Sequence, residues 1–397
     1  MSSRTRAIVL ALSAPVVVFA IVGGLLGTVL ARGEDTSYQH LKIFDDVVSL
    51  ISSNYVEPVN IDKVMRGAMN GLVDSLDPDS AYLSPDEVKQ QESGAALPAG
   101  DLGIELTRQY YLRILAARDN SPAAKAGLRT GDYVRAINDA PTRDMSVWQG
   151  MRALRGPVGS KVTLTIFRGN AADPHVVTLT RETLASLDVT GRSAAAGVGY
   201  VRVPAIGPRT ADQLKSQVAE LAKTGATKLV IDVRRTTSGT YDQGLALARL
   251  FVSKGTLAIR ETKGAPTKDT ITAASGDGSI NLPAVVLMDN GTSGAAELFA
   301  SALNGNQRAD LVGEHTIGRA GVQKLVKLPG GSGLWLTTVR YLTPSGNPLH
   351  EKGLEPTVPV EGPEVEFGQP APAADIMLDK AIERVQAPQV LAEKKAA

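Results

Sequence analysis

Residues 285–323 contain the part of this sequence best suited to hold a reactive side chain. The segment opens with an apolar run, Val285 to Met288, which is long enough for a buried strand. A turn of small and polar residues leads to Gly294, and apolar residues then recur at helical spacing as far as Leu303. A strand, a tight turn and a helix are a common setting for a nucleophile, because the turn exposes one side chain and the helix N-terminus favours negative charge.

This segment resembles the active-site signature of the C-terminal processing peptidases, which are serine proteases that use a Ser–Lys dyad. In that signature, a Ser-Ala-Ser-Ala-Ser-Glu run precedes a helix, and an Arg-Ala pair and a Gly-Glu-x-Thr-x-Gly-Lys-Gly-x-x-Gln run follow it. The matching residues of this chain are Glu297, Arg308, Ala309, Gly313, Glu314, Thr316, Gly318 and Gln323. The resemblance implies a protease-like α/β core.

Two positions of the signature lack the chemistry that the dyad needs. Counting back three residues from Glu297, the family's nucleophilic serine falls on Gly294, which has no side chain. The family's general-base lysine falls on Arg319. An arginine cannot act as a base at neutral pH, because its pKa stays above about 12, whereas the pKa of a buried lysine shifts readily. We interpret the segment as a protease scaffold without its dyad.

A third departure concerns the loop after the predicted strand 227–235. The family has Asp-Leu-Arg-x-Asn-Pro-Gly-Gly there, and its glycines help to form the oxyanion hole. This chain has a Thr236-Thr237 pair followed by Ser238 and Gly239. An oxyanion hole needs backbone N–H groups directed at the developing charge, and the β-branched pair with one glycine lost changes that turn.

An active serine endopeptidase with a rearranged site is the alternative interpretation. Ser293 precedes the nucleophile position, but a shift of one residue turns a helical side chain by about 100°, so Ser293 is expected to face away and to cap the helix instead. His315 or Lys324 would have to serve as its base, and neither occupies the family's lysine position. Ser238 is a weaker candidate nucleophile, and Gln323 and Gly239 are further remnants of the family's site.

Residues 95–185 resemble a PDZ domain, with alternating short strands and one helix, DMSVWQGMRALRG. Such a domain captures a peptide by adding it as a strand to a sheet edge, while loop N–H groups bind the terminal carboxylate. Leu102, Gly103 and Ile104 would supply that loop, since glycine lets the backbone approach a ligand closely. The resemblance therefore implies partners with free C-termini, against the alternative that the domain only packs on its neighbour.

Residues 34–94 have a helical pattern that resembles the N-terminal region of the same peptidases. Asp62 is a plausible N-cap for its second helix, and Asp77-Pro78 would end that helix. The resemblance adds a dimer contact as an expectation. At the other end of the chain, Ile376 to Val385 is expected to form a helix capped by Asp375.

Composition excludes several classes of function. The 397 residues carry a net charge of +1 without a dense basic block, so nothing indicates nucleic-acid binding. Apolar residues make up 43% and charged residues 21%, which is an ordinary globular balance. The absence of cysteine excludes disulfides, and four scattered histidines give no metal-ligand spacing. We expect no metal and no cofactor.

The N-terminus suggests a location outside the cytoplasm. Arg4 and Arg6 precede an uncharged run from Ala7 to Ala31, which is long enough to span a bilayer as a helix. Basic residues on the N-terminal side favour keeping that end in the cytoplasm. The run is expected to be an uncleaved single-pass anchor in the inner membrane, with the soluble part in the periplasm; a cleaved signal peptide is the alternative.

The sequence thus predicts a multidomain α/β protein that binds without cleaving. The expected divisions are a membrane anchor at 1–33, a helical region at 34–94, a PDZ domain at 95–185, a protease-like α/β core at 186–362, and a linker with a C-terminal helix at 363–397. The expected partners are peptide or protein C-termini, an active paralogous protease, the membrane, and a second copy of the chain.

Overall fold

The computed structural model describes residues 38–169, 173–363, 365–370 and 372–387, and the chain divides into two compact units between Gly71 and Leu72. The first unit contains a helix over residues 38–54 and the start of α2 (Ile61–Asp74). Asn60 Oδ1 accepts a hydrogen bond from the Lys63 N–H (3.0 Å), so the expected N-cap, Asp62, lies inside the helix.

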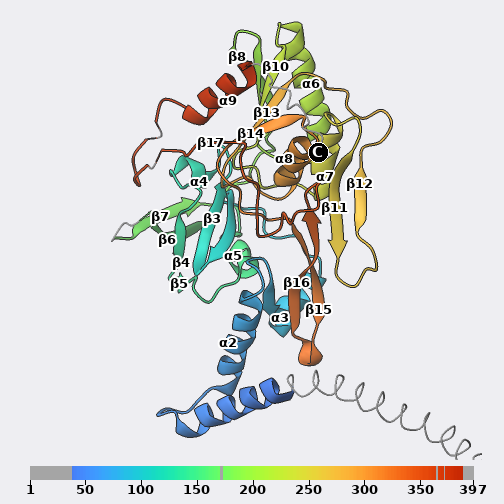
Figure 1. The fold of residues 1–397 in the computed structure, drawn as a ribbon. Helices are drawn as coiled ribbons and strands as arrows, with labels where there is room; N and C mark the ends of the chain where they lie inside the picture. The colour runs from blue at the N-terminus through green and yellow to red at the C-terminus, as the bar shows by residue number, and fades with distance from the viewer. Residues whose placement is uncertain (1–37, 170–172, 364, 371, 388–397) are drawn as a thin grey trace, which may run out of the picture. The chain divides into compact units, whose positions relative to one another are not determined.

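A small β domain follows in the second unit (Figure 1). Its sheet has the order β2-β3-β4-β6-β7, with β5 paired to β4, so β2 lies at one edge. Inward-facing apolar side chains alternate along these strands and form a core of their own. Its elements are β2 (Ile104–Gln109), β3 (Tyr111–Ala117), α4 (Pro122–Lys125), β4 (Tyr133–Ile137), β5 (Ala140–Pro141), α5 (Val147–Leu154), β6 (Lys161–Phe167) and β7 (His175–Thr180).

The α/β core is built on a sheet with the order β17-β14-β13-β10-β9-β8, parallel except for the β8–β9 hairpin. Helices cover both faces, which is why its strands are apolar on both sides. The elements are β8 (Thr190–Ala195), β9 (Val198–Arg202), α6 (Thr210–Lys223), β10 (Lys228–Asp232), α7 (Tyr241–Arg249), β13 (Ala284–Met288), α8 (Ala295–Gly305), β14 (Ala309–Gly313), β17 (Val358–Pro359) and α9 (Ile376–Gln386).

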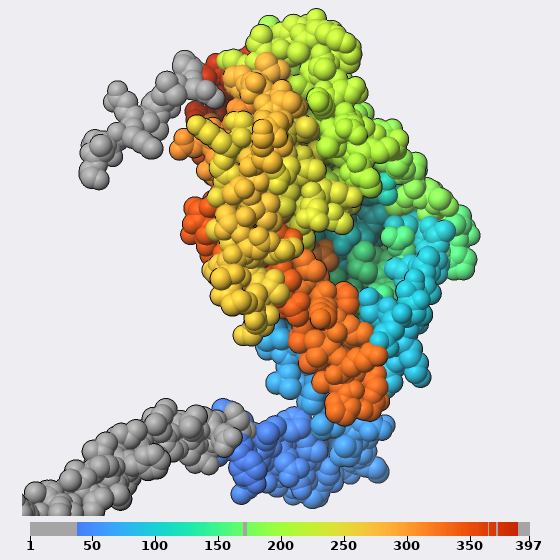
Figure 2. All heavy atoms as spheres, turned by 90° about the vertical axis from the view of Figure 1, so that its right-hand side faces the viewer, coloured from blue at the N-terminus to red at the C-terminus, as the bar shows by residue number. Residues whose placement is uncertain are grey.

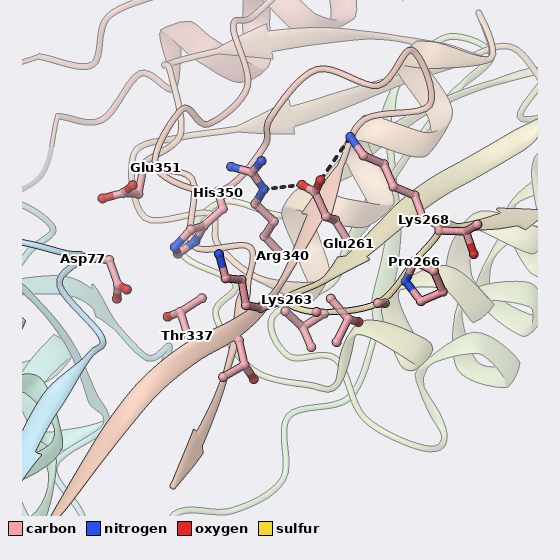
Figure 3. A pocket seen from close by; sticks show the side chains of 15 residues that line it. Asp77, Glu261, Lys263, Pro266, Lys268, Thr337, Arg340, His350 and Glu351 are labelled. Atoms are coloured by element: carbon pink, nitrogen blue, oxygen red, sulfur yellow. Dashed lines mark hydrogen bonds and ion pairs between the residues drawn. The ribbon is translucent and has the colours of Figure 1, made fainter. Parts of the chain in front are cut away.

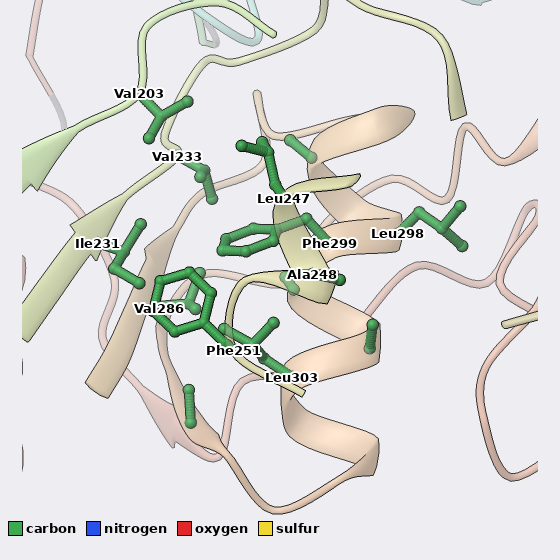
Figure 4. Packing of buried hydrophobic residues seen from close by; sticks show 14 of the residues in the cluster. Val203, Ile231, Val233, Leu247, Ala248, Phe251, Val286, Leu298, Phe299 and Leu303 are labelled. Atoms are coloured by element: carbon green, nitrogen blue, oxygen red, sulfur yellow. The ribbon is translucent and has the colours of Figure 1, made fainter. Parts of the chain in front are cut away.

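Alternate residues of the central strands face opposite helices. Ile231 and Val286 point toward α7 and α8, where they pack with Phe251 and Phe299, as Figure 4 shows. Val230 and Val285 point to the other face, against α9. The alternation fixes the register of β10 and β13, because a slip by one residue would exchange the two faces. It thereby fixes where the turn after each strand begins.

A second sheet has the order β1-β16-β11-β12, with β15 also paired to β16. Trp148 of α5 packs with Leu83, Val88 and Trp335, which connects the small β domain to this sheet. Figure 2 shows the contact from outside, with the cyan and teal β domain beside the orange strands β15 and β16. The elements are β1 (Ala81–Leu83), α3 (Pro85–Glu92), β11 (Thr256–Thr262), β12 (Asp269–Thr272), β15 (Gly321–Lys327), η1 (Pro329–Gly331) and β16 (Gly333–Leu342).

The predicted mixed α/β fold with several domains is confirmed. The strand at 285–288, the helix that follows it and the C-terminal helix capped by Asp375 are all present, and Asp375 Oδ1 accepts from the Leu378 N–H (3.1 Å). The chain enters the core sheet through the β8–β9 hairpin, which turns at Gly197, with φ 71°. The expected helical region also contains a short strand, β1.

The membrane localisation needs correction. No helix in the described part of the chain is long and apolar enough to cross a bilayer. The run Ala7 to Ala31, expected to be a single-pass anchor, lies outside the described residues. The inner-membrane anchor and the periplasmic location therefore have no structural support.

Asp232, the last residue of β10, organises the loop that follows. Its side chain is 2% exposed, accepts a hydrogen bond from the Tyr200 hydroxyl (2.7 Å) and pairs with Arg234 (2.6 Å) and Arg202 (3.7 Å). Burial alone would raise the pKa of Asp232, but the two guanidinium groups outweigh it and lower the pKa to about 2. Arg234 also pairs with Asp375 (2.7 Å), which connects this loop to the start of α9.

We predict that Asp232→Asn lowers stability in a pH-dependent way. A carboxylate with a depressed pKa stabilises the fold above the unfolded-state pKa of about 4, and this contribution disappears as the pH falls toward about 2. The lowered pKa of Asp232 corresponds to roughly 2–3 kcal/mol of pH-dependent difference in the free energy of unfolding. Urea denaturation of both proteins at several pH values measures it, and the difference should shrink below about pH 4. A pH-independent difference would contradict this account.

Candidate functional site

The turn before α8 has a fixed conformation. Asp289 Oδ1 accepts from the backbone N–H groups of Gly291 (3.0 Å) and Arg235 (2.9 Å), and burial raises the pKa of this carboxyl. The Ser293 N–H donates to the Thr236 carbonyl (3.0 Å). The turn after β13 is therefore hydrogen-bonded to the loop after β10. In a parallel sheet, the loops after adjacent strands emerge at the same edge, and this edge is where such folds build their sites.

Gly294 occupies the N-cap of α8 in a conformation that side chains disfavour. Its φ of 65° and ψ of −118° lie in a region that residues other than glycine rarely adopt. Sharp strand-to-helix turns of this kind expose the nucleophile in enzymes that use them. A Cβ added here would be 3.8 Å from the Arg319 carbonyl oxygen and 3.9 Å from the Thr237 carbonyl oxygen, which leaves room for a small side chain.

Glu297 connects this helix start to residues 316–319. Its carboxylate is fully buried and accepts four hydrogen bonds. The donors are Thr316 Oγ1 (2.5 Å) and the N–H groups of Gly318 (2.7 Å), Arg319 (2.9 Å) and Gly294 (3.0 Å). Burial raises the pKa of Glu297, and these hydrogen bonds oppose the rise. The two degenerate positions, 294 and 319, are thus held beside each other by one carboxylate.

The side chain of Arg319 is committed to two carboxylates. Its Nε and Nη2 atoms lie 3.0 Å and 2.7 Å from the oxygens of Asp79, and its Nη1 lies 2.7 Å from Glu105 Oε1. Burial alone would lower the pKa of Arg319, but Asp79 and Glu105 raise it further above its ordinary value. Glu105 belongs to β2 of the small β domain, so this arginine connects the core to that domain. A guanidinium in this position is a permanent cation and accepts no proton.

The loop 236–239 presents the wrong group for an oxyanion hole. The Thr236 hydroxyl donates to the Val203 carbonyl (2.6 Å), and Ser238 Oγ accepts from the Ile206 N–H (3.1 Å). Both side chains thus hold the loop against residues 203–206. The closest loop atom to the Cβ position of residue 294 is the Thr237 carbonyl oxygen. A carbonyl oxygen carries partial negative charge, so this atom cannot serve as a donor to an oxyanion.

The other sequence-predicted residues lie apart from a dyad geometry. Ser293 is 1% exposed, its Oγ has no hydrogen-bond partner, and the helix N-cap is Gly294, so the expectation that Ser293 caps α8 is wrong. Gln323 Nε2 donates to Thr337 Oγ1 (3.1 Å) across β15 and β16. Gly239, with φ 103°, lies against Ile206.

The predicted peptide-binding loop lies at the start of the edge strand β2. Leu102 and Ile104 are buried, at 0% and 4% exposure. Gly103 has φ 73°, and a Cβ there would be 2.2 Å from the Ser121 Cβ, so only glycine fits. The paired edge of β2 belongs to β3, and the opposite edge faces away from the sheet. This is the arrangement that strand addition requires.

A separate cavity of about 570 Å³ contains none of the predicted site residues. Glu261 lies in it between Arg340 (2.6 Å) and Lys268 (3.2 Å), as Figure 3 shows, so these charges pair with each other. Across the described ranges, no group of three or more Asp, Glu or His side chains is placed to hold a metal ion.

Three models of known families match successive parts of this chain. The model of Peptidase family S41 matches residues 197–360, a PDZ domain model matches 113–168, and a model of the activating protease CtpB N-terminal domain matches 28–87. The chain is 30% identical over 343 residues to a carboxy-terminal-processing protease of Bartonella bacilliformis, an alignment that covers 85% of this chain and 78% of that protein. This chain belongs to the C-terminal processing peptidases.

Other members of the C-terminal processing peptidases agree over similar lengths. The chain is 27% identical over 342 residues to the carboxy-terminal processing protease CtpA of Bacillus subtilis, covering 86% of this chain and 72% of that protein. Among solved structures, the photosystem II D1 C-terminal processing protease is 27% identical, with a TM-score of 0.66, and the match covers 77% of this chain and 84% of that chain.

Sequence reasoning missed the partners of Arg319. Asp79 and Glu105 lie 240 and 214 residues away from Arg319 in the chain. Asp79 directly follows the Asp77-Pro78 pair, and Glu105 directly follows the peptide loop. No local spacing connects the three residues. The one available signal was the arginine itself, because a cation in a buried position needs anionic partners.

We predict that Arg319→Met destabilises the protein by about 3–5 kcal/mol, because it leaves two carboxylates largely buried without a cation. Adding Asp79→Asn and Glu105→Gln to Arg319→Met should recover most of that loss. Arg340→Met is the matched control, since Arg340 is half exposed in its pair with Glu261, and it should cost at most about 1 kcal/mol. Chemical denaturation compares these three variants with the wild type, and equal losses at Arg319 and Arg340 would refute the structural role.

Proposed function

We propose that this chain is a non-cleaving member of the C-terminal processing peptidases that binds peptide or protein C-termini through its PDZ domain. It acts as a scaffold or as a regulator, with an active paralogous protease as one candidate partner. The observation that carries the proposal is the pair of residues at the dyad positions. Gly294 offers no nucleophile, and the Arg319 guanidinium is already paired with Asp79 and Glu105.

Hydrolysis by a Ser–Lys dyad needs a hydroxyl, a deprotonated amine within hydrogen-bond reach of it, and N–H donors for the oxyanion. Position 294 lacks the hydroxyl and position 319 lacks the amine. The atom of the loop 236–239 that lies closest to the Cβ position of residue 294 is the Thr237 carbonyl oxygen, which is not a hydrogen-bond donor. Three independent requirements thus argue against turnover by the family's mechanism.

The alternative, an endopeptidase that uses Ser293, finds little support in the geometry. Ser293 Oγ is buried, and among the described residues it has no hydrogen-bond partner that could act as its base. His315 faces Glu355 (3.5 Å). Ser238 Oγ is engaged with the backbone of Ile206.

We predict that the purified full chain does not cleave an unfolded protein or a peptide with an apolar C-terminus. The expected rate equals that of a buffer blank, because neither a nucleophile nor a base is in place. Gel analysis and mass spectrometry of the substrate after long incubation provide the measurement. Ser293→Ala and Ser238→Ala are the controls: cleavage by the wild type that either change abolishes would overturn the proposal.

We further predict that Gly294→Ser with Arg319→Lys restores weak activity at best. The serine fits sterically but adopts a strained backbone, at a cost of roughly 1–3 kcal/mol. The new lysine would be held charged by Asp79 and Glu105, so Asp79→Asn and Glu105→Gln are added to free its amine. Restoring Asn-Pro-Gly at 236–238 addresses the oxyanion, where one donor is worth about 10²–10³ in rate.

The single, double, four-site and seven-site variants are compared on the same unfolded substrate. Residues of a dyad act as a unit, so each single variant should be inactive and activity should rise only with the combined changes. Activity of Gly294→Ser alone would show that another residue already supplies the base. A seven-site variant that folds and binds peptide but shows no turnover would show that the site has diverged beyond these positions.

A further inference from the structure

The two N–H groups at the start of the PDZ peptide loop point at one oxygen atom. The Leu102 N–H donates to Asp101 Oδ1 at 2.7 Å, and the Gly103 N–H donates to the same atom at 3.0 Å. Backbone donors that converge on a single oxygen are the geometry that binds a carboxylate. In this structure, the carboxylate they bind belongs to the preceding residue of the chain.

The other oxygen of that carboxylate has a cationic partner. Asp101 Oδ2 lies 2.7 Å from Arg155 Nη2, and the two side chains are 14% and 31% exposed. Arg155 follows the C-terminal end of α5, the helix that packs against β2. Asp101 therefore receives two N–H groups on one oxygen and a guanidinium on the other, a full set of contacts for a peptide's terminal carboxylate.

The loop around these donors is rigid and needs no rearrangement to bind. The Leu102 and Gly103 carbonyls accept from the N–H groups of Ala123 (3.1 Å) and Arg118 (2.7 Å). The Asp101 backbone exchanges two hydrogen bonds with Glu182 (2.9 and 3.0 Å). Because the backbone is held on both sides, rotation of the Asp101 side chain alone would vacate the donors.

We propose that Asp101 is an internal competitor that occupies the carboxylate site of the PDZ domain until a C-terminal peptide displaces it. The site consists of the Leu102 and Gly103 N–H groups and the Arg155 guanidinium. This inference rests on the proposed function, because it concerns the ligand of the same domain. The inference adds Arg155 as a residue that recognises the terminal carboxylate. It also means that the Asp101 carboxylate lowers the affinity of the domain for any free C-terminus.

The edge of β2 is engaged at a second point. Arg319 Nη1 lies 3.4 Å from the Leu106 carbonyl oxygen, in addition to its ion pair with Glu105. A peptide that adds as a strand along this edge would need that carbonyl. Ligand binding at the PDZ domain therefore competes with contacts made by the degenerate base position, and the two sites of the chain are physically connected.

The test measures binding of a fluorescent peptide with an apolar C-terminus to the full chain by titration, with the free acid and the C-terminal amide compared. Asp101→Ala empties the carboxylate site, so affinity for the free acid should rise about tenfold to hundredfold, while the amide should bind as weakly as before. Asp101→Asn keeps an oxygen for the two N–H groups but loses the charge pairing with Arg155, and should give an intermediate gain. Asp144→Ala, an exposed carboxylate of the same domain, is the matched control and should change nothing.

Arg155→Gln in the Asp101→Ala background should remove about tenfold of the gained affinity for the free acid and none for the amide. If wild type and both Asp101 variants bind the free acid equally, the internal-competitor inference is wrong and the peptide-binding function stands. If no variant binds the free acid better than the amide, carboxylate capture itself is wrong, and the proposed function fails with it.

Discussion

A single buried carboxylate determines the geometry of the degenerate site. Glu297 accepts hydrogen bonds from the start of its own helix and from three residues of the segment 316–319. A buried carboxylate is stable only when its oxygens accept hydrogen bonds. Loss of any one of these donors would therefore lower the free energy of unfolding considerably. The relation between positions 294 and 319 therefore does not depend on which side chains stand there. The architecture of the site can persist without the chemistry.

Position 319 takes part in ion pairs that connect two domains. A lysine can be neutral when buried, which is what a general base requires, but an arginine remains charged and needs anionic neighbours. Asp79 and Glu105 supply them from either side. Because Glu105 belongs to β2, the ion pair of Arg319 connects the core to the PDZ domain. Catalytic side chains usually need some freedom of movement, whereas the two ion pairs hold the Arg319 side chain in place.

The sequence alone was sufficient to predict the features that depend on a local pattern of residues. The apolar run at 285–288 and the helical spacing after Gly294 predicted β13 and α8, because burial of both sheet faces imposes that pattern. The missing dyad was visible as two residue types. The partners of Arg319 and the occupation of the peptide loop by Asp101 were not predictable. The contacts of Arg319 with Asp79 and of Asp101 with Arg155 depend on how distant segments pack. The contacts of Asp101 with the next two N–H groups are local, but no residue pattern in the sequence indicated them.

The ion pairs of Arg319 with Asp79 and Glu105 also limit which substitutions could give this chain a general base. A change of arginine back to lysine does not recreate a base, since both carboxylates would keep the new amine protonated. Removing the carboxylates first would leave the arginine's charge uncompensated in a largely buried place. Neither step alone therefore yields a free amine, and removing a carboxylate first also costs stability. A free amine at position 319 therefore requires changes at positions 319, 79 and 105 together.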